Sequence, residues 1–214
     1  MTNEVLNRTK AAILSGLISA GSMAGEVANK VKAYCAEATP TAVLTRVQND
    51  EAEPVNRLEV LGQLPGNLDY YGMAEEQGDS NFWKARAQWL PLKKGPLSFG
   101  VVGQHMNGSK FPEHNEAGPV VRLSGKPVKG LFGKLDLRYF PDRESFDWYG
   151  LLNSKRFYAD CLGVYNHETE KGFVRPGLDI KLGKDFSVGV EGKLAGHKDD
   201  LRQKYVGVRV KKKF

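Results

Sequence analysis

Charged side chains recur at every second position along several segments of this 214-residue chain. Between residues 131 and 140, for example, Lys134, Asp136 and Arg138 alternate with apolar residues. Side chains at every second position of a β-strand share one face of the sheet. A face rich in Lys and Arg can bind anions or can line a water-filled passage for ions. The residues that we expect to line such a passage are Lys84, Arg86, Lys134, Asp136, Arg138, Arg175, Asp179, Lys181, Glu191, Lys193 and Arg209.

A second group of reactive side chains lies in or beside the stretch 106–117, which we expect to be the longest loop because it contains Asn-Gly and a proline. A Ser/His/acid hydrolase needs a hydrogen-bonded triad, which closeness in sequence does not supply, and a closed metal site needs a ligand spacing that is absent here. We therefore predict a solvated loop with no catalytic residue, cofactor or metal, and keep a barrel lipid hydrolase as a minor alternative. The side chains concerned are His105, Ser109, Glu113, His114 and Glu116.

The elements that must position the charged residues are β-strands, because the hydrophobic pattern has a period of two from residue 42 onward. Short polar turns separate the segments, which predicts an all-β fold, an antiparallel up-and-down β-barrel of about 10–12 strands over residues 42–214. Alternation is strong in 57–64, 82–89, 97–104, 131–140, 157–165, 178–182, 186–194 and 205–211, and weaker in 42–48, 69–76, 118–124 and 146–152.

The opposite face of these strands is apolar. In a soluble barrel or sandwich that face would be buried, whereas in a membrane barrel it would contact lipid and the charged face would line a wet lumen. A soluble barrel of ten or more strands would need a large apolar cavity or a plug, which favours the membrane barrel. The residues that we expect on the membrane face are Trp83, Trp89, Leu135, Leu137, Val188, Val190, Val206, Val208 and Phe214.

Composition excludes several other classes. A hydrophobic content of 41% and a charged content of 26% exclude wholesale disorder, and no apolar run is long enough for a membrane-spanning helix. The net charge of +6 comes from basic residues that are interleaved with acidic ones, so nucleic acid is not an expected partner. Cys35 and Cys161 could pair in an exported protein or could both be simply buried.

The first 41 residues have a different character. Residues 1–24 contain a basic start with Arg8 and Lys10, an uncharged stretch and small residues near position 24, as in a secretory signal peptide. The same residues also begin a helical stripe at Ile13 and Leu17, so a retained helix is the alternative reading. Residues 25–41 are expected to form a helix and a linker.

The chain ends on Phe214, with Val210, Val208 and Val206 at every second place before it. This ending resembles the last strand of bacterial outer-membrane β-barrels, which typically stops on an aromatic residue that the barrel-assembly machinery reads. The resemblance implies an outer-membrane location, a pore, transport or structural role, and the lipid bilayer and that machinery as partners. The alternative is a periplasmic or secreted soluble β-protein that binds a hydrophobic ligand or a protein partner.

Charge predicts what such a pore would pass. Basic residues outnumber acidic ones on the charged face, so an open lumen would carry a net positive field. Low-dielectric walls focus such a field, and small anions should therefore be mildly preferred over cations.

Overall fold

The computed structural model of the protein describes residues 41–49, 52–109, 111–197 and 200–213. The predicted signal peptide or helix (1–24) lies outside these residues, as do Cys35, Phe214 and, apart from Thr41, the helix and linker expected at 25–41. Among the described residues, no helix is long and apolar enough to cross a membrane.

Twelve strands, one for each segment with alternating hydrophobicity, make up nearly all of the described chain, together with the short 3-10 helix η1 (Pro141–Arg143). The weakly alternating segments are strands as well. The strands are β1 (Thr41–Asn49), β2 (Ala52–Leu64), β3 (Leu68–Gln77), β4 (Ser80–Lys94), β5 (Leu97–Gly108), β6 (Phe111–Val128), β7 (Leu131–Phe140), β8 (Ser145–Ser154), β9 (Phe157–Asn166), β10 (Lys171–Lys181), β11 (Phe186–His197) and β12 (Asp200–Lys213).

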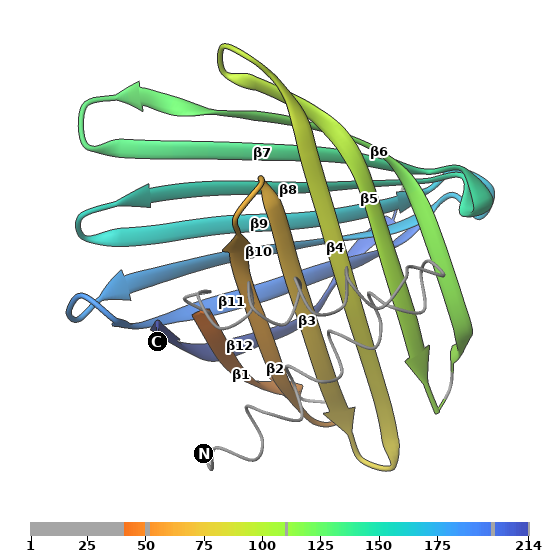
Figure 1. The fold of residues 1–214 in the computed structure, drawn as a ribbon. Coiled ribbons are helices and arrows are strands. Elements are labelled where there is room, and N and C mark those ends of the chain that lie inside the picture. Colours follow the sequence, from red (N-terminus) through yellow and green to blue (C-terminus); the bar gives the residue numbers. More distant parts are fainter. Residues whose placement is uncertain (1–40, 50–51, 110, 198–199, 214) are drawn as a thin grey trace, which may run out of the picture.

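Each strand pairs antiparallel with the next, and β1 pairs with β12, so the sheet closes into a barrel (Figure 1). The closing pair aligns Thr41 with Lys213 and Thr45 with Arg209. Closure removes the two sheet edges, whose unpaired N–H and C=O groups would otherwise invite pairing with other chains. The predicted antiparallel up-and-down barrel is thereby confirmed, with the highest strand number of the predicted range.

Connections between antiparallel neighbours alternate between the two ends of the barrel. One end carries five turns together with the start of β1 and the end of β12, and we call it the basic rim because its turns and strand ends contain Lys93, Lys94, Lys126, Lys129, Lys155, Arg156 and Lys184. The other end we call the acidic rim, since its turns and strand ends contain Glu76, Asp79, Asp142, Glu144 and Glu168. Gly95 and Gly130 adopt positive φ angles of 60° and 82°, as tight hairpin turns require.

The prediction of a long loop at 106–117 is wrong, because most of this stretch belongs to two strands. β5 continues to Gly108 and β6 already begins at Phe111, with Met106 paired to His114. Two features misled the prediction, the Asn-Gly pair and Pro112. The pair sits at the end of β5, and the proline is tolerated because it lies at the beginning of a strand, where no ladder hydrogen bond needs its missing N–H.

The inside and outside of the barrel are opposite in character. Asp179 is fully buried at 0% exposure, whereas its neighbour Ile180 points outward at 63% exposure. The same alternation sends Leu178, Val188, Val190, Val206 and Val208 outward and turns Glu191, Lys181 and Arg209 inward. The predicted assignment of these residues to two faces is therefore confirmed.

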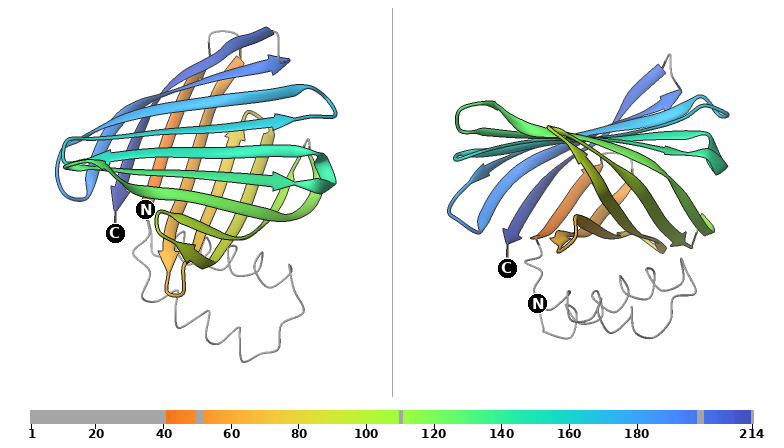
Figure 2. Two further views of the ribbon diagram at one scale, coloured as in Figure 1. Left: turned by 90° about the horizontal axis from the view of Figure 1, so that it is seen from above. Right: turned by 45° about the horizontal axis from the view of Figure 1, so that its top comes forward.

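The two sides of the barrel wall cross each other. In Figure 1, β3, β4 and β5 run at a large angle to β7, β8, β9 and β10, and both views in Figure 2 show the same crossing. Inward side chains from the two walls consequently reach one another, as the hydrogen bond from Arg86 on β4 to Asp147 on β8 shows. The buried Arg, Asp and Glu side chains of the described residues lie in this interior.

Candidate functional site

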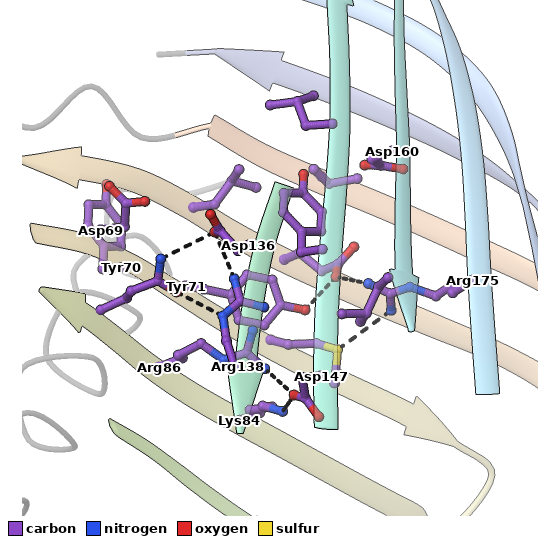
Figure 3. Close-up of a pocket in the computed structure, with 18 of the residues that line it drawn as sticks. Asp69, Tyr70, Tyr71, Lys84, Arg86, Asp136, Arg138, Asp147, Asp160 and Arg175 are labelled. Atoms are coloured by element: carbon purple, nitrogen blue, oxygen red, sulfur yellow. Dashed lines mark hydrogen bonds and ion pairs between the residues drawn. The ribbon is translucent and has the colours of Figure 1, made fainter. Parts of the chain in front are cut away.

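The barrel encloses a cavity of about 990 Å³ that is lined by side chains from all twelve strands. Its lining includes eight of the residues predicted to face a lumen, namely Lys84, Arg86, Lys134, Asp136, Arg138, Arg175, Lys193 and Arg209. The other three, Asp179, Lys181 and Glu191, point to the same side of the sheet. Asp179 and Glu191 accept hydrogen bonds from cavity residues, whereas Lys181 donates to Asn153 near the basic rim. Figure 3 shows part of the lining, with Arg86, Arg138 and Asp147 gathered close together and Arg175 apart from them.

One group of ion pairs is centred on Glu59 and Glu191. Arg175 donates to Glu59 over 2.7 Å, and the Tyr71 hydroxyl donates to the same carboxylate over 2.5 Å. Glu191 pairs with Arg57 and accepts a hydrogen bond of 3.0 Å from Tyr205. The two carboxylates of this group are 5% and 2% exposed, so their charges are compensated by protein groups.

A second group is centred on Arg209 of β12. Its guanidinium binds both oxygens of Asp179, at 2.7 and 2.8 Å, and donates to Asp160 over 2.8 Å. Lys211 approaches the same two carboxylates, at 2.7 Å from Asp179 and 3.3 Å from Asp160. Gly177 leaves the room for this arrangement, because a Cβ atom there would lie 2.1 Å from Nη1 of Arg209.

A third group covers the wall formed by β3 to β7. Asp136 accepts hydrogen bonds from Arg122, at 2.6 and 2.9 Å, and from Arg138, at 3.0 Å. Arg122 also pairs with Asp69, and Arg138 also donates to Gln88 over 2.8 Å. The bidentate Arg122–Asp136 pair fixes both side chains in one geometry.

The same wall continues toward the acidic rim. Arg86 donates to Asp147 over 3.1 Å and to Gln104 over 3.1 Å, and Gln104 in turn donates to Glu116 over 2.8 Å. Lys84 lies 4.0 Å from Asp147. These contacts connect β4, β5, β6 and β8 into one hydrogen-bonded network.

Cations remain in excess after the pairs are counted. Twelve Lys and Arg residues line the cavity against six Asp and Glu residues. With Lys181, Asp179, Glu191 and Glu116 included, the described interior holds thirteen cations and nine carboxylates. Lys93 and Lys193 form no ion pair with a described residue, and Lys193 instead stands 4.8 Å from the centre of the Phe173 ring. The cavity can therefore attract anions.

Sequence reasoning missed several interior residues. Asp69 and Asp147 lie in segments whose alternation was weak, and Glu116 lies in the stretch predicted to be a loop. Asp160 lies on the opposite face of a segment in which only the apolar face was considered. Extending the period of two through each segment would have found them, because each occupies an inward position. The interior also contains a buried apolar cluster formed by Leu90, Val102, Val120 and Phe140.

The residues predicted for the membrane face lie on the outside of the barrel where they are described, namely Trp83, Trp89, Leu135, Leu137, Val188, Val190, Val206 and Val208. Trp89 and Val208 are 50% and 57% exposed, whereas Trp83 packs on the ring of His105 at a centroid distance of 4.5 Å. Cys161 also lies on the outer face and has a free thiol.

The histidines near residue 110 do not form one site. His105 points outward and bonds with Asn115, whereas His114 and Glu116 point inward, 3.1 Å apart. Because strand alternation places the two histidines on opposite faces of the sheet, these residues do not come together as a hydrolase triad or a metal site. No group of three or more potential metal ligands occurs within the part of the chain that the structure describes.

No family model matches the chain, and no curated protein matches it in sequence. Solved structures of outer-membrane porins do match its fold. The KdgM porin superimposes with a TM-score of 0.60 at 17% identity, over 81% of this chain and 99% of that one. The NanC porin gives 0.56 at 11% identity, over 82% and 98% of the chains, and Omp33 of Acinetobacter baumannii gives 0.56 at 7% identity, over 83% and 98%. The chain thus has the β-barrel fold of outer-membrane porins.

Proposed function

We propose that this protein is an outer-membrane pore that passes small anionic solutes. The observation that carries the proposal is a cavity lined by twelve cations and six carboxylates inside a barrel whose outer face is apolar. Positive charge in a narrow aqueous space between low-dielectric walls favours anions over cations. No catalytic constellation lies among the described residues of the cavity, so the proposed role is passage.

The outer face supports the membrane location. Ile180, Leu182 and Val101 are 63%, 65% and 57% exposed. Contact of so many apolar side chains with water would be unfavourable, whereas contact with lipid would not. The described strands contain 9 to 18 residues, and roughly 9–11 tilted residues suffice to cross a bilayer. A soluble barrel would place these side chains in its core, so the outer face does not favour that alternative. The barrel-assembly machinery is part of the proposal as the partner that would insert the chain.

The solute class can be narrowed further. One solved KdgM porin is described as a complex with disordered oligogalacturonate, an acidic sugar polymer. The cavity of this chain offers both groups that such a ligand needs, guanidinium and ammonium groups for carboxylates and aromatic rings for sugar faces. Tyr149, Tyr158 and Phe173 line it beside Lys134, Arg175 and Lys193. Acidic oligosaccharides are therefore our proposed solutes.

Reversal potentials across planar bilayers of neutral lipid would test the pore. With a KCl gradient, we expect a mild preference for chloride that decreases in the Lys93→Gln/Lys193→Gln double variant. Both lysines line the cavity without an ion pair to a described residue, so their removal orphans no carboxylate. Lys171→Gln, an exposed lysine at the acidic rim, is the matched control and should leave selectivity unchanged. Absence of conductance, or preference for cations at low salt, would refute the proposal.

A further inference from the structure

A groove of about 660 Å³ lies on the outside of the barrel, over β6, β7, β8 and β9 and beside the basic rim. Its outward-facing lining is apolar. Leu123, Leu135 and Leu152 are 48%, 36% and 43% exposed there, and Pro96 and Pro127 lie at its rim end. The groove lies across the barrel wall from the interior cavity, and the strand positions of Ser124, Lys134, Leu151 and Asp160 border both.

Glycines make the groove hollow. Gly125, Gly133 and Gly150 occupy outward positions, where Gly125 pairs with Gly133, Gly133 with Leu152, and Gly150 with Leu135. A Cβ atom at Gly125 would meet nothing within 4 Å, and one at Gly150 would meet only the Cys161 carbonyl oxygen, at 3.9 Å. Side chains would therefore fit sterically at these two positions, and the hollow exists because they are absent.

Five cations lie around the rim end of this groove. They lie at three adjacent turns, with Lys94 beside the β4–β5 turn, Lys126 and Lys129 at the β6–β7 turn, and Lys155 and Arg156 in the β8–β9 turn. None of the five pairs with a carboxylate of the described residues, and the segments 94–98, 126–131 and 153–158 contain no acidic residue. Figure 1 shows the β6–β7 and β8–β9 turns on the same side of the barrel. The groove thus has an apolar body and a cationic end.

We propose that this groove binds one anionic glycerophospholipid, with an acyl chain along the glycines and the phosphate at Lys126 and Lys129. The inference rests on the proposed membrane location, which places the outer face in lipid. An acyl chain matches the apolar lining, and a phosphate at headgroup level meets unpaired lysines, each of which contributes about fivefold to the binding of anionic lipid.

A second copy of the chain fits the groove less well. Two barrels inserted in the same direction can be related only by an axis along the membrane normal. Such a pair would bring the lysines of both copies to the same level and face like charges with like charges, which is unfavourable. The cationic end therefore favours the lipid as occupant.

Native mass spectrometry of the full-length protein in detergent would test the site with phosphatidylglycerol as the probe and phosphatidylcholine as the neutral lipid. We expect one phosphatidylglycerol to be retained, and the Lys126→Gln/Lys129→Gln variant to bind it at least about tenfold more weakly. Lys184→Gln/Lys213→Gln removes the same charge from the same rim away from the groove and should change binding less than about twofold.

A groove-filling variant tests the acyl chain separately. Gly150→Leu should abolish retention, whereas Gly103→Leu should not, although Gly103 is also outward and a Cβ there would likewise meet a carbonyl oxygen at 3.9 Å. Equal binding of the two lipids, equal loss in both lysine variants, or stronger retention of lipid A than of phosphatidylglycerol would overturn the proposal. Conductance is measured in neutral lipid, so an absence of phosphatidylglycerol binding would not affect the test of the pore. An absence of conductance would likewise not affect the number of lipids detected by mass spectrometry.

Discussion

The Arg209 group allows a stability prediction to be worked from the structure. Arg209 is 3% exposed and makes three hydrogen bonds to Asp179 and Asp160, while Asp179 is 0% exposed. Removing one partner of a buried pair costs roughly 3–5 kcal/mol because the remaining charge is uncompensated. Lys211, 2.7 Å from Asp179, partly compensates, so we expect Arg209→Met to lower the free energy of unfolding by about 3 kcal/mol, the lower end of that range.

The assay is equilibrium urea unfolding of the refolded barrel in lipid vesicles, followed by tryptophan fluorescence. Asp179→Asn alone should also destabilise the barrel. The double variant Arg209→Met/Asp179→Asn should lose less than the sum of the two, with a coupling of about 1–3 kcal/mol, because neither partner is left charged and alone. Arg202→Gln is the control, since Arg202 pairs with Asp200 on the surface at 74% side-chain exposure and should matter little. Additive single effects, or a loss below about 1 kcal/mol for Arg209→Met, would refute the reasoning.

Three further predictions follow from the orientation and charge of the barrel. Val101→Arg, at a 57% exposed outward position in the middle part of the barrel wall, should destabilise the barrel in vesicles by about 2–4 kcal/mol, and much less in detergent. The anion preference of the pore should shrink from 0.1 M to 1 M KCl, as the Debye length falls from about 10 to about 3 Å, and a salt-independent reversal potential would contradict this. Deleting Phe214 should reduce membrane insertion in cells far more than the stability of the purified folded protein, and normal insertion would count against assembly through the terminal strand.

Strand positions and faces were predictable because a two-residue period is a local property of the sequence. Every predicted segment is a strand, and residues such as Ile180 and Asp179 fall on the expected sides. The pairing partners of the charges were not predictable, since Arg57 on β2 meets Glu191 on β11, which is 134 residues away in the sequence and is brought close by the closure of the barrel. The prediction of a loop at 106–117 was wrong because it relied on glycine and proline, which are local turn signals. In the closed sheet each strand has a neighbour on both sides, and β5 pairs with both β4 and β6 through this stretch.

The interior contains two kinds of cation, those held in buried ion pairs and those without a carboxylate partner among the described residues. Among the described residues the apolar clusters inside the barrel are small, so buried ion pairs such as Arg209–Asp179 and Arg122–Asp136 fill much of its inside. Such cations are neutralised by carboxylates at hydrogen-bond distance and contribute little field to a passing ion. Lys93 and Lys193 have no such partner among the described residues, so their charge acts on the cavity. Stability and selectivity should therefore respond to different substitutions, although both sets of side chains lie on the same face of the sheet.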